Sequence, residues 1–176
     1  MTVKNILEEQ ELQVIAFKLG KEEYAVAITS VQEIIMPQIK TKIPRSPEFV
    51  EGVINLRGNI IPVIDGRKRF GIELTDETPE TRIMVLELES NTVGLTVDSV
   101  LEVIHMQTKD IQTSPVNADK SQDFILGIGK FKERLIILLD PDNFLDLHEI
   151  DSITNLAKTA ENLKELAVLS EKEKIK

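Results

Sequence analysis

The stretch SVQEII at residues 30–35 recurs as SVLEVI at residues 99–104, 69 residues further along the chain. Five of the six positions are identical or conservatively matched, and the same offset aligns residues 15–19 with residues 84–88 without a gap. A repeat this long is a whole subdomain, because the units of solenoid arrays are shorter. The chain is therefore predicted to contain two diverged copies of one unit.

A second pair of blocks aligns at an offset of 75 residues. FVEGV at residues 49–53 corresponds to FILGI at residues 124–128, and IIPVID at residues 60–65 corresponds to LIILLD. Two strands rich in Val and Ile can align by chance, but chance does not predict several matched blocks in the same order. Duplication is the better explanation.

Each copy reads as a series of short β-strands. Apolar and polar residues alternate around polar turns, and no long helical pattern intervenes, which is typical of antiparallel hairpins. Residues 31–36 fit either a third strand or a single helical turn. The predicted strands of the first copy are residues 14–19, 24–28, 31–36, 50–56 and 60–64. Four or five such strands suit a small closed barrel, which has no exposed sheet edge, and the two barrels are expected to share a core.

The domain organisation follows from the repeat. Subdomain 1 is expected at about residues 14–70 and subdomain 2 at about residues 82–147, after an N-terminal segment of residues 1–13. Apolar residues spaced three and four apart between Ile150 and Ala167 predict a C-terminal amphipathic helix over residues 149–172. The fold class is therefore mainly β with one terminal helix.

Composition restricts the kinds of partner. Of the 176 residues, 21 are Lys or Arg and 30 are Asp or Glu, which gives a net charge of −9. Such a chain repels nucleic acid and anionic lipid, and its basic stretches, Arg67–Arg69 and Lys130–Arg134, are short and diluted by acids. Cysteine is absent, and no apolar run or signal peptide is evident, so we expect a cytoplasmic protein that does not insert into a membrane.

Motifs for chemistry are largely missing. His105 and His148 stand apart from any obvious ligand or base, and surface or structural roles are the ordinary explanation for both. Gly127-Ile128-Gly129 lacks the third glycine of a dinucleotide loop, and Asp140-Pro141-Asp142-Asn143 lacks the glycine and closing glutamate of a calcium loop. We predict no catalytic residue, no metal site and no cofactor, and hence a protein that is not an enzyme.

One segment looks like a binding site. Asn55 and Arg57 occupy the tip of a predicted hairpin among apolar residues, where the second copy has Lys130 and Lys132, with Glu133 in place of Gly58. The ordinary alternative is that Arg57 holds its own turn or pairs with a nearby carboxylate, as guanidinium groups often do. The sequence alone leaves both interpretations open.

This hairpin, GVINLRG at residues 52–58, resembles the CheW-like coupling proteins of bacterial chemotaxis. The likeness extends over about residues 14–147 and includes Pro62–Asp65, Val31–Ile34 and Gly94–Val103. It implies two intertwined SH3-like five-stranded β-barrels and an adaptor in a two-component signal transduction system. The adaptor's task is to link the cytoplasmic tips of methyl-accepting chemotaxis receptors to the regulatory domain of the histidine kinase CheA. The protein would then be recruited to receptor arrays at the membrane.

The resemblance also implies roles for individual residues. Gly52, Glu33 and Asn55 are expected at the kinase-binding surface, and Arg57 is expected to take part in coupling. Apolar positions on equivalent strands would line a groove between the barrels that receives the helical receptor tip. These positions are Val31, Ile34, Val100 and Val103. The alternative is that these four side chains are simply core.

Two features separate the chain from close alternatives. Gly66 stands where the family usually has Leu, which is expected to loosen the turn after residues 62–65. A CheV-like protein would continue into a receiver domain, for which about 30 residues beyond the second copy are too few. A kinase regulatory domain, or an interaction module with a different partner, remains the alternative function.

Overall fold

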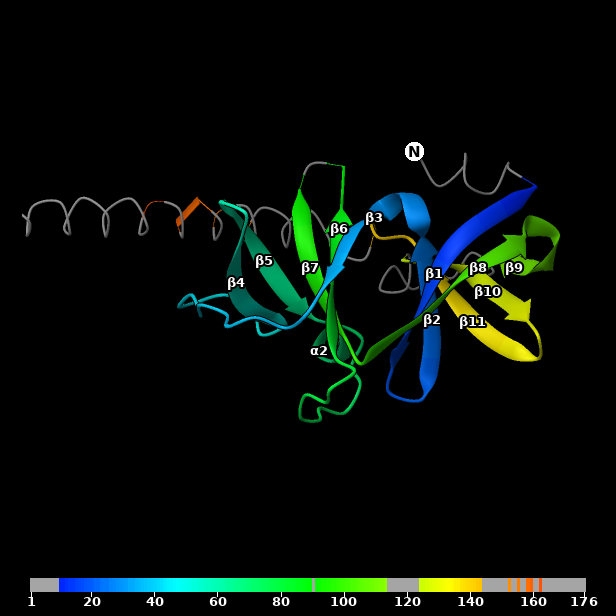
Figure 1. Ribbon diagram of the computed structural model, residues 1–176, viewed down its shortest axis with the longest axis horizontal. Helices are drawn as coiled ribbons and strands as arrows, with labels where there is room; N and C mark the ends of the chain where they lie inside the picture. The colour runs from blue at the N-terminus through cyan, green and yellow to red at the C-terminus, as the bar shows by residue number, and fades with distance from the viewer. Residues whose placement is uncertain are drawn as a thin grey trace, which may run out of the picture.

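The computed structural model describes residues 10–89, 91–113 and 124–143, together with residues 152, 155, 158, 159 and 162. Two β-sheets lie side by side along the long axis of the molecule (Figure 1). The mainly β architecture predicted from the sequence is confirmed. The five described residues beyond residue 143 are helical, as predicted for the C-terminal segment.

The six-stranded sheet has the order β8-β1-β2-β11-β10-β9. Its strands are β1 (Glu11–Leu19), β2 (Glu22–Ala27), β8 (Ser99–Gln107), β9 (Ile111–Thr113), β10 (Ile125–Phe131) and β11 (Arg134–Leu139). The five-stranded sheet has the order β3-β6-β7-β5-β4. Its strands are β3 (Val31–Ile35), β4 (Val50–Leu56), β5 (Asn59–Asp65), β6 (Arg82–Glu87) and β7 (Thr92–Val97). Short helical turns complete the fold, namely η1 (Ile28–Ser30), η2 (Thr108–Asp110) and α2 (Gly66–Arg69).

The two sheets exchange strands between the copies. The first hairpin of copy one, β1–β2, joins the last four strands of copy two, whereas β6–β7 of copy two joins β3, β4 and β5 of copy one. The copies are therefore intertwined, as the resemblance implied. The sequence boundaries near residues 14–70 and 82–147 remain a prediction about the repeat, and each sheet draws strands from both parts.

Strand register shows the duplication in detail. Leu138 faces Ala25 in the parallel pair β11·β2, and the equivalent residues Val63 and Gly94 face each other in β5·β7. The register shift of β10 against β11 lies 75 residues beyond that of β4 against β5. Bulges and parallel pairings are local irregularities that chance alignment does not reproduce, so the two sheets are structural copies.

The sheets are barrel-like, but their hydrogen-bond ladders do not close. Among the described residues, β8 and β9 are the two ends of the six-stranded sheet, and the chain itself joins them through the turn η2. In the five-stranded sheet, Thr41 and Val53 exchange two backbone hydrogen bonds of 2.9 Å, so the chain after β3 reaches β4. The predicted closure is thus achieved by a bent chain and a single bridge instead of a full ladder.

Three apolar clusters hold this arrangement. One fills the six-stranded sheet and one the five-stranded sheet, while the largest lies between them and includes Phe17, Leu86 and Leu139. Several strands are buried on both faces. In β1, Val14 and Ala16 face the six-stranded interior, and Ile15 and Phe17 face the shared core. The expectation of a shared core is confirmed.

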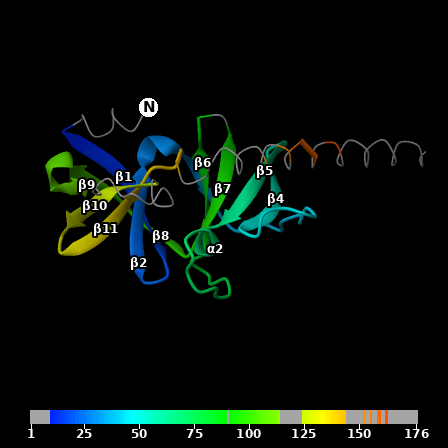
Figure 2. The ribbon, with the colours of Figure 1, turned by 180° about the vertical axis from the view of Figure 1, so that it is seen from behind.

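The helical turn α2 sits between the two sheets in both views of the ribbon (Figure 1 and Figure 2). Its first residue, Gly66, is buried, and a Cβ there would lie 2.7 Å from the Thr96 carbonyl oxygen and 2.9 Å from a Leu19 methyl group. Close packing therefore explains the glycine, and the turn that it begins is tight. Arg67 then donates to both carboxylate oxygens of Asp98, at 2.8 and 2.5 Å.

Candidate functional site

The hairpin between β4 and β5 presents Arg57 at its tip. Arg57 and Gly58 both have positive φ, 53° and 89°, which is the type I′ turn favoured for two-residue hairpins. The Asn55 side chain accepts a hydrogen bond of 2.9 Å from the Gly58 backbone N–H. Asn55 therefore shapes the turn, and its amide group remains exposed at the surface.

Arg57 lies against an acidic residue of the neighbouring edge strand. Its guanidinium donates to Glu33 Oε2 at 2.8 Å. The Arg57 side chain is 76% exposed, whereas that of Glu33 is 19% exposed. The alternative that Arg57 pairs with a nearby carboxylate is therefore confirmed, but an exposed pair of this kind adds little stability and leaves further guanidinium donors free for a partner.

Gly52 is not at the surface. It is buried on β4 with φ of 148°, and a Cβ would lie 2.5 Å from the carbonyl oxygen of Thr41. The glycine therefore permits the Thr41–Val53 bridge, because any side chain there would collide with backbone. The structure places Gly52 beneath the expected kinase-binding surface, close to Glu51 and Lys40.

The four apolar positions share a setting on the two edge strands β3 and β8. Val31 is paired with Leu86, and Val100 with Phe17. Residues directly opposite in an antiparallel pair point to the same face. Leu86 and Phe17 belong to the shared core, and Val31 and Val100 pack against it, so the core alternative holds for these two valines.

Ile34 and Val103 extend that core to the surface. They are paired with Met84 and Ile15, which are shared-core residues, yet they are 40% and 45% exposed. We call Val31, Ile34, Val100 and Val103 the apolar edge. Both strands that carry it cross the near side of the ribbon in Figure 1, on either side of the middle. The shared core therefore reaches solvent at equivalent points of the two copies.

Further apolar side chains beside the apolar edge were missed from the sequence. Met36 is 58% exposed, Ile39 is 97% exposed and Leu101 is 39% exposed. Met36 and Ile39 stand in the proline-containing segment after β3, where no strand or helix period predicts which side chains are exposed. Their signal was only that apolar residues occur in an irregular segment.

The second hairpin, β10–β11, has different chemistry at its tip. Lys132 and Glu133 form the turn with φ of 46° and 65°. Arg134 donates to Glu23 at 2.9 Å and to Glu102 at 2.6 Å, and its side chain is 33% exposed. Glu102 is the counterpart of Glu33, so both copies pair an edge-strand glutamate with an arginine of the closing hairpin.

No cluster suited to metal binding occurs among the described residues, and none of the described helical segments is long and apolar enough to cross a membrane. His105 lies on β8 with its Nδ1 atom 3.2 Å from Glu11 at an exposed position. His148 lies outside the described residues. The described surface is therefore characterised by an apolar edge and an exposed guanidinium, which are features suited to binding another protein.

Comparison with known proteins gives a consistent result. The family model described as CheW-like domain matches residues 13–149. The chain is 35% identical over 137 residues to the chemotaxis protein CheW of Helicobacter pylori, covering 78% of this chain and 83% of that one. It is 36% identical over 135 residues to CheW of Bacillus subtilis, covering 76% and 86%. The crystal structure of the scaffolding protein TtCheW from Thermoanaerobacter tengcongensis matches with a TM-score of 0.72 and 37% identity, over 78% of this chain and 94% of that one.

Proposed function

The chain belongs to the CheW-like family of chemotaxis scaffold proteins, and from this premise we propose that it couples transmembrane chemoreceptors to the histidine kinase CheA. It catalyses nothing in this proposal and acts in the cytoplasm by holding two binding surfaces at a fixed separation. One surface receives the cytoplasmic receptor tip, and the other receives the regulatory domain of the kinase.

The observation that carries the proposal is the apolar edge. Exposed Ile34 and Val103 continue the shared core outward from both copies. A helix pair binds well to an apolar surface bordered by polar groups, and Glu33 and Arg57 lie beside Ile34 on the same edge of the five-stranded sheet. The receptor tip is therefore placed against the apolar edge, with Arg57 at its border.

Fixed geometry supports the role of an adaptor. The two sheets share one core, exchange strands and are joined by the Arg67–Asp98 pair. Glu33, Asn55 and the region above Gly52 are assigned to the kinase. Contacts of this kind are usually modest in area, so array formation would depend on many of them acting together.

The proposal is tested by calorimetric titration of the full chain with a CheA regulatory domain and, separately, with a soluble receptor tip fragment. We expect saturable binding to both, with Arg57→Glu weakening binding and leaving the circular dichroism spectrum unchanged. Ile34→Asp is expected to weaken receptor binding selectively. Absence of wild-type binding to the kinase domain at about 100 μM, weaker than most specific contacts, would contradict the kinase half of the proposal.

A further inference from the structure

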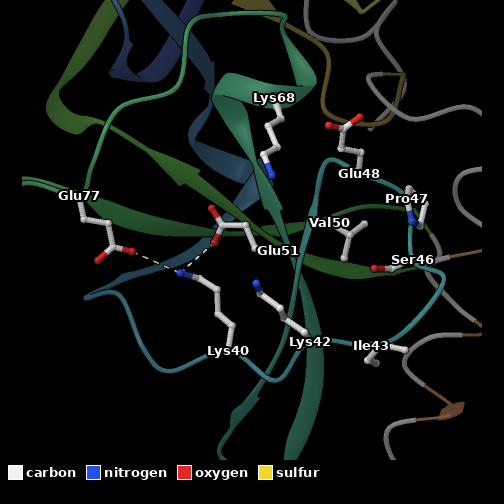
Figure 3. A pocket seen from close by; sticks show the side chains of 10 residues that line it. All are labelled: Lys40, Lys42, Ile43, Ser46, Pro47, Glu48, Val50, Glu51, Lys68 and Glu77. Atoms are coloured by element: carbon white, nitrogen blue, oxygen red, sulfur yellow. Dashed lines mark hydrogen bonds and ion pairs between the residues drawn. The ribbon is translucent and has the colours of Figure 1, made fainter.

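A cleft of about 540 Å³ opens on the five-stranded sheet beside Gly52 (Figure 3). Its walls are the segment after β3, strand β4 and the helical turn α2. The charged side chains that line it are Lys40, Lys42, Glu48, Glu51, Lys68 and Glu77. Sequence analysis found basic residues diluted by acids, but folding brings Lys68 of α2 together with two lysines from a distant segment.

Lys40 is neutralised from within the cleft. Its ammonium group lies 2.8 Å from Glu51 and 3.4 Å from Glu77, and its side chain is 14% exposed. Burial lowers the pKa of Lys40, but the hydrogen bonds and charges of Glu51 and Glu77 outweigh it and raise the pKa above its ordinary value. Lys40, Glu51 and Glu77 therefore form a satisfied floor that has little charge to offer a ligand.

Lys42 and Lys68 are different. Both are exposed, and in Figure 3 their ammonium groups point from two sides toward Glu51. Within the described part of the chain, neither side chain makes an ion pair or hydrogen bond. Glu48 is the remaining acidic side chain of the lining, so two unpaired cations face one unpaired anion in a protein of net charge −9.

The position of these lysines is fixed by the backbone. Asp65 accepts hydrogen bonds from the backbone N–H groups of Arg67 and Lys68, which holds α2 in place. Thr41, between Lys40 and Lys42, is bonded to Val53 directly against Gly52. A side chain at residue 52 would displace Thr41 and both neighbouring lysines, so Gly52 is a positioning residue for this cleft.

We propose that this cleft is a docking site for an acidic segment of the kinase regulatory domain, whose carboxylates are received by Lys42 and Lys68. The identity of the partner rests on the proposed function, whereas the preference for carboxylates rests on the charges of the cleft. Gly52 contributes by holding the wall and makes no contact with the partner.

The first experiment does not need the kinase. The full chain, labelled with nitrogen-15, is titrated with capped tetraglutamate and, as a matched neutral control, capped tetraglutamine. We expect saturable shifts of the Lys42 and Lys68 amides with tetraglutamate alone, and their loss in Lys42→Glu/Lys68→Glu. Shifts spread equally to Lys109, or the same shifts with inorganic phosphate at lower concentration, would overturn the assignment to acidic segments.

The second experiment measures binding of the regulatory domain to Lys42→Glu, Lys68→Glu and Lys109→Glu. Each variant changes the net charge equally, but Lys109 lies on η2 of the other sheet. We expect Kd to rise roughly tenfold for Lys42→Glu and Lys68→Glu, with steeper salt dependence in the wild type, and to change less than about twofold for Lys109→Glu. Equal binding by all three would overturn the docking site and leave the adaptor function standing. No binding by the wild type would instead refute the kinase partnership, and the peptide titration would then decide the fate of the cleft.

Discussion

The hairpins β4–β5 and β10–β11 occupy equivalent places in the two sheets, yet their arginines do different work. Arg134 reaches Glu23 and Glu102 across three strands and is 33% exposed, whereas Arg57 meets Glu33 alone and is 76% exposed. The glutamates Glu33 and Glu102 are equivalent in the repeat, but the arginines are displaced by two positions. One copy uses its guanidinium to join strands, and the other presents it to solvent.

The comparison teaches that duplication conserved the framework more strictly than the surface. Bulges, parallel pairs and close glycine contacts recur at fixed offsets, and both Gly52 and Gly127 lie against the backbone of the chain segment that closes their sheet. The side chains at the hairpin tips then diverged, because exposed positions carry little of the packing energy. Variants that act on the framework should therefore have larger effects on stability than variants at the tips.

The largest effect is expected from the shared core. Phe17 and its equivalent Leu86 are buried in the cluster between the sheets. Phe17→Ala should lower the free energy of unfolding by about 3–5 kcal/mol and Leu86→Ala by about 2–5 kcal/mol, because each leaves a cavity. Differential scanning calorimetry should show one transition in the wild type and in both variants. Two separated transitions would show that the sheets unfold independently and would break the comparison at its base.

The junction between the sheets comes next. Asp98 accepts two hydrogen bonds from Arg67 and one of 2.7 Å from the Gly20 backbone N–H. Burial raises the pKa of Asp98, but Arg67 and the Gly20 amide outweigh it and hold the pKa below the ordinary value of 3.8. Asp98→Asn should therefore cost about 2 kcal/mol at neutral pH, the scale of hydrogen bonds to a charged group.

The same pair gives a pH dependence with a defined sign. A carboxyl whose pKa is lower in the folded state stabilises the protein above its unfolded pKa, and that stabilisation is lost as pH falls toward the folded pKa. The difference in Tm between wild type and Asp98→Asn should therefore be constant from pH 7 to about 5 and shrink below about pH 4. Asp110→Asn, an exposed change on η2, serves as the control. A difference that grows on acidification would contradict the assignment.

Much of the framework could be read from the sequence, because offset and alternation are local signals. The blocks at residues 30–35 and 99–104 indicated the duplication, and polar turns marked the hairpins. The exchange of strands could not be derived from these patterns, since β1 would satisfy its alternation equally well beside β3 or β8. The intertwined arrangement was available only through the resemblance.

The site was predictable to a smaller degree. The sequence drew attention to Arg57 but could not choose between a free guanidinium and one paired with a carboxylate, because Glu33 is distant in the chain. It also placed Gly52 at a binding surface, whereas the structure buries it against Thr41. Lys42 and Lys68 escaped notice, because only the folded chain brings them to one cleft.

The two arginines provide the direct test of their different roles. Arg134→Ala should lower the free energy of unfolding by about 1–2 kcal/mol, because it leaves the mostly buried Glu23 without its partner. Arg57→Ala should change it by less than about 0.5 kcal/mol, as expected for an exposed pair. Urea unfolding followed by circular dichroism measures both. Equal losses would mean that Arg57 holds its sheet together as Arg134 does, and its assignment to a partner would lose support.

The smallest effect concerns the turns themselves. Glu133 has φ of 65°, in the left-handed region that is unfavourable for residues with a side chain, whereas its counterpart Gly58 has φ of 89°. Glu133→Gly should therefore stabilise the protein by about 0.5 kcal/mol, since relief of the left-handed conformation is partly offset by the greater freedom of glycine in the unfolded chain. A Cβ at residue 58 would meet no heavy atom within 4 Å, so Gly58→Ala tests conformation without collision and should cost about 1 kcal/mol. Opposite signs for the two changes, measured by thermal unfolding, would show that the backbone of both turns is the same and that only the residues placed on it differ. A destabilising Glu133→Gly would instead assign to the Glu133 side chain an interaction that outweighs the conformational cost.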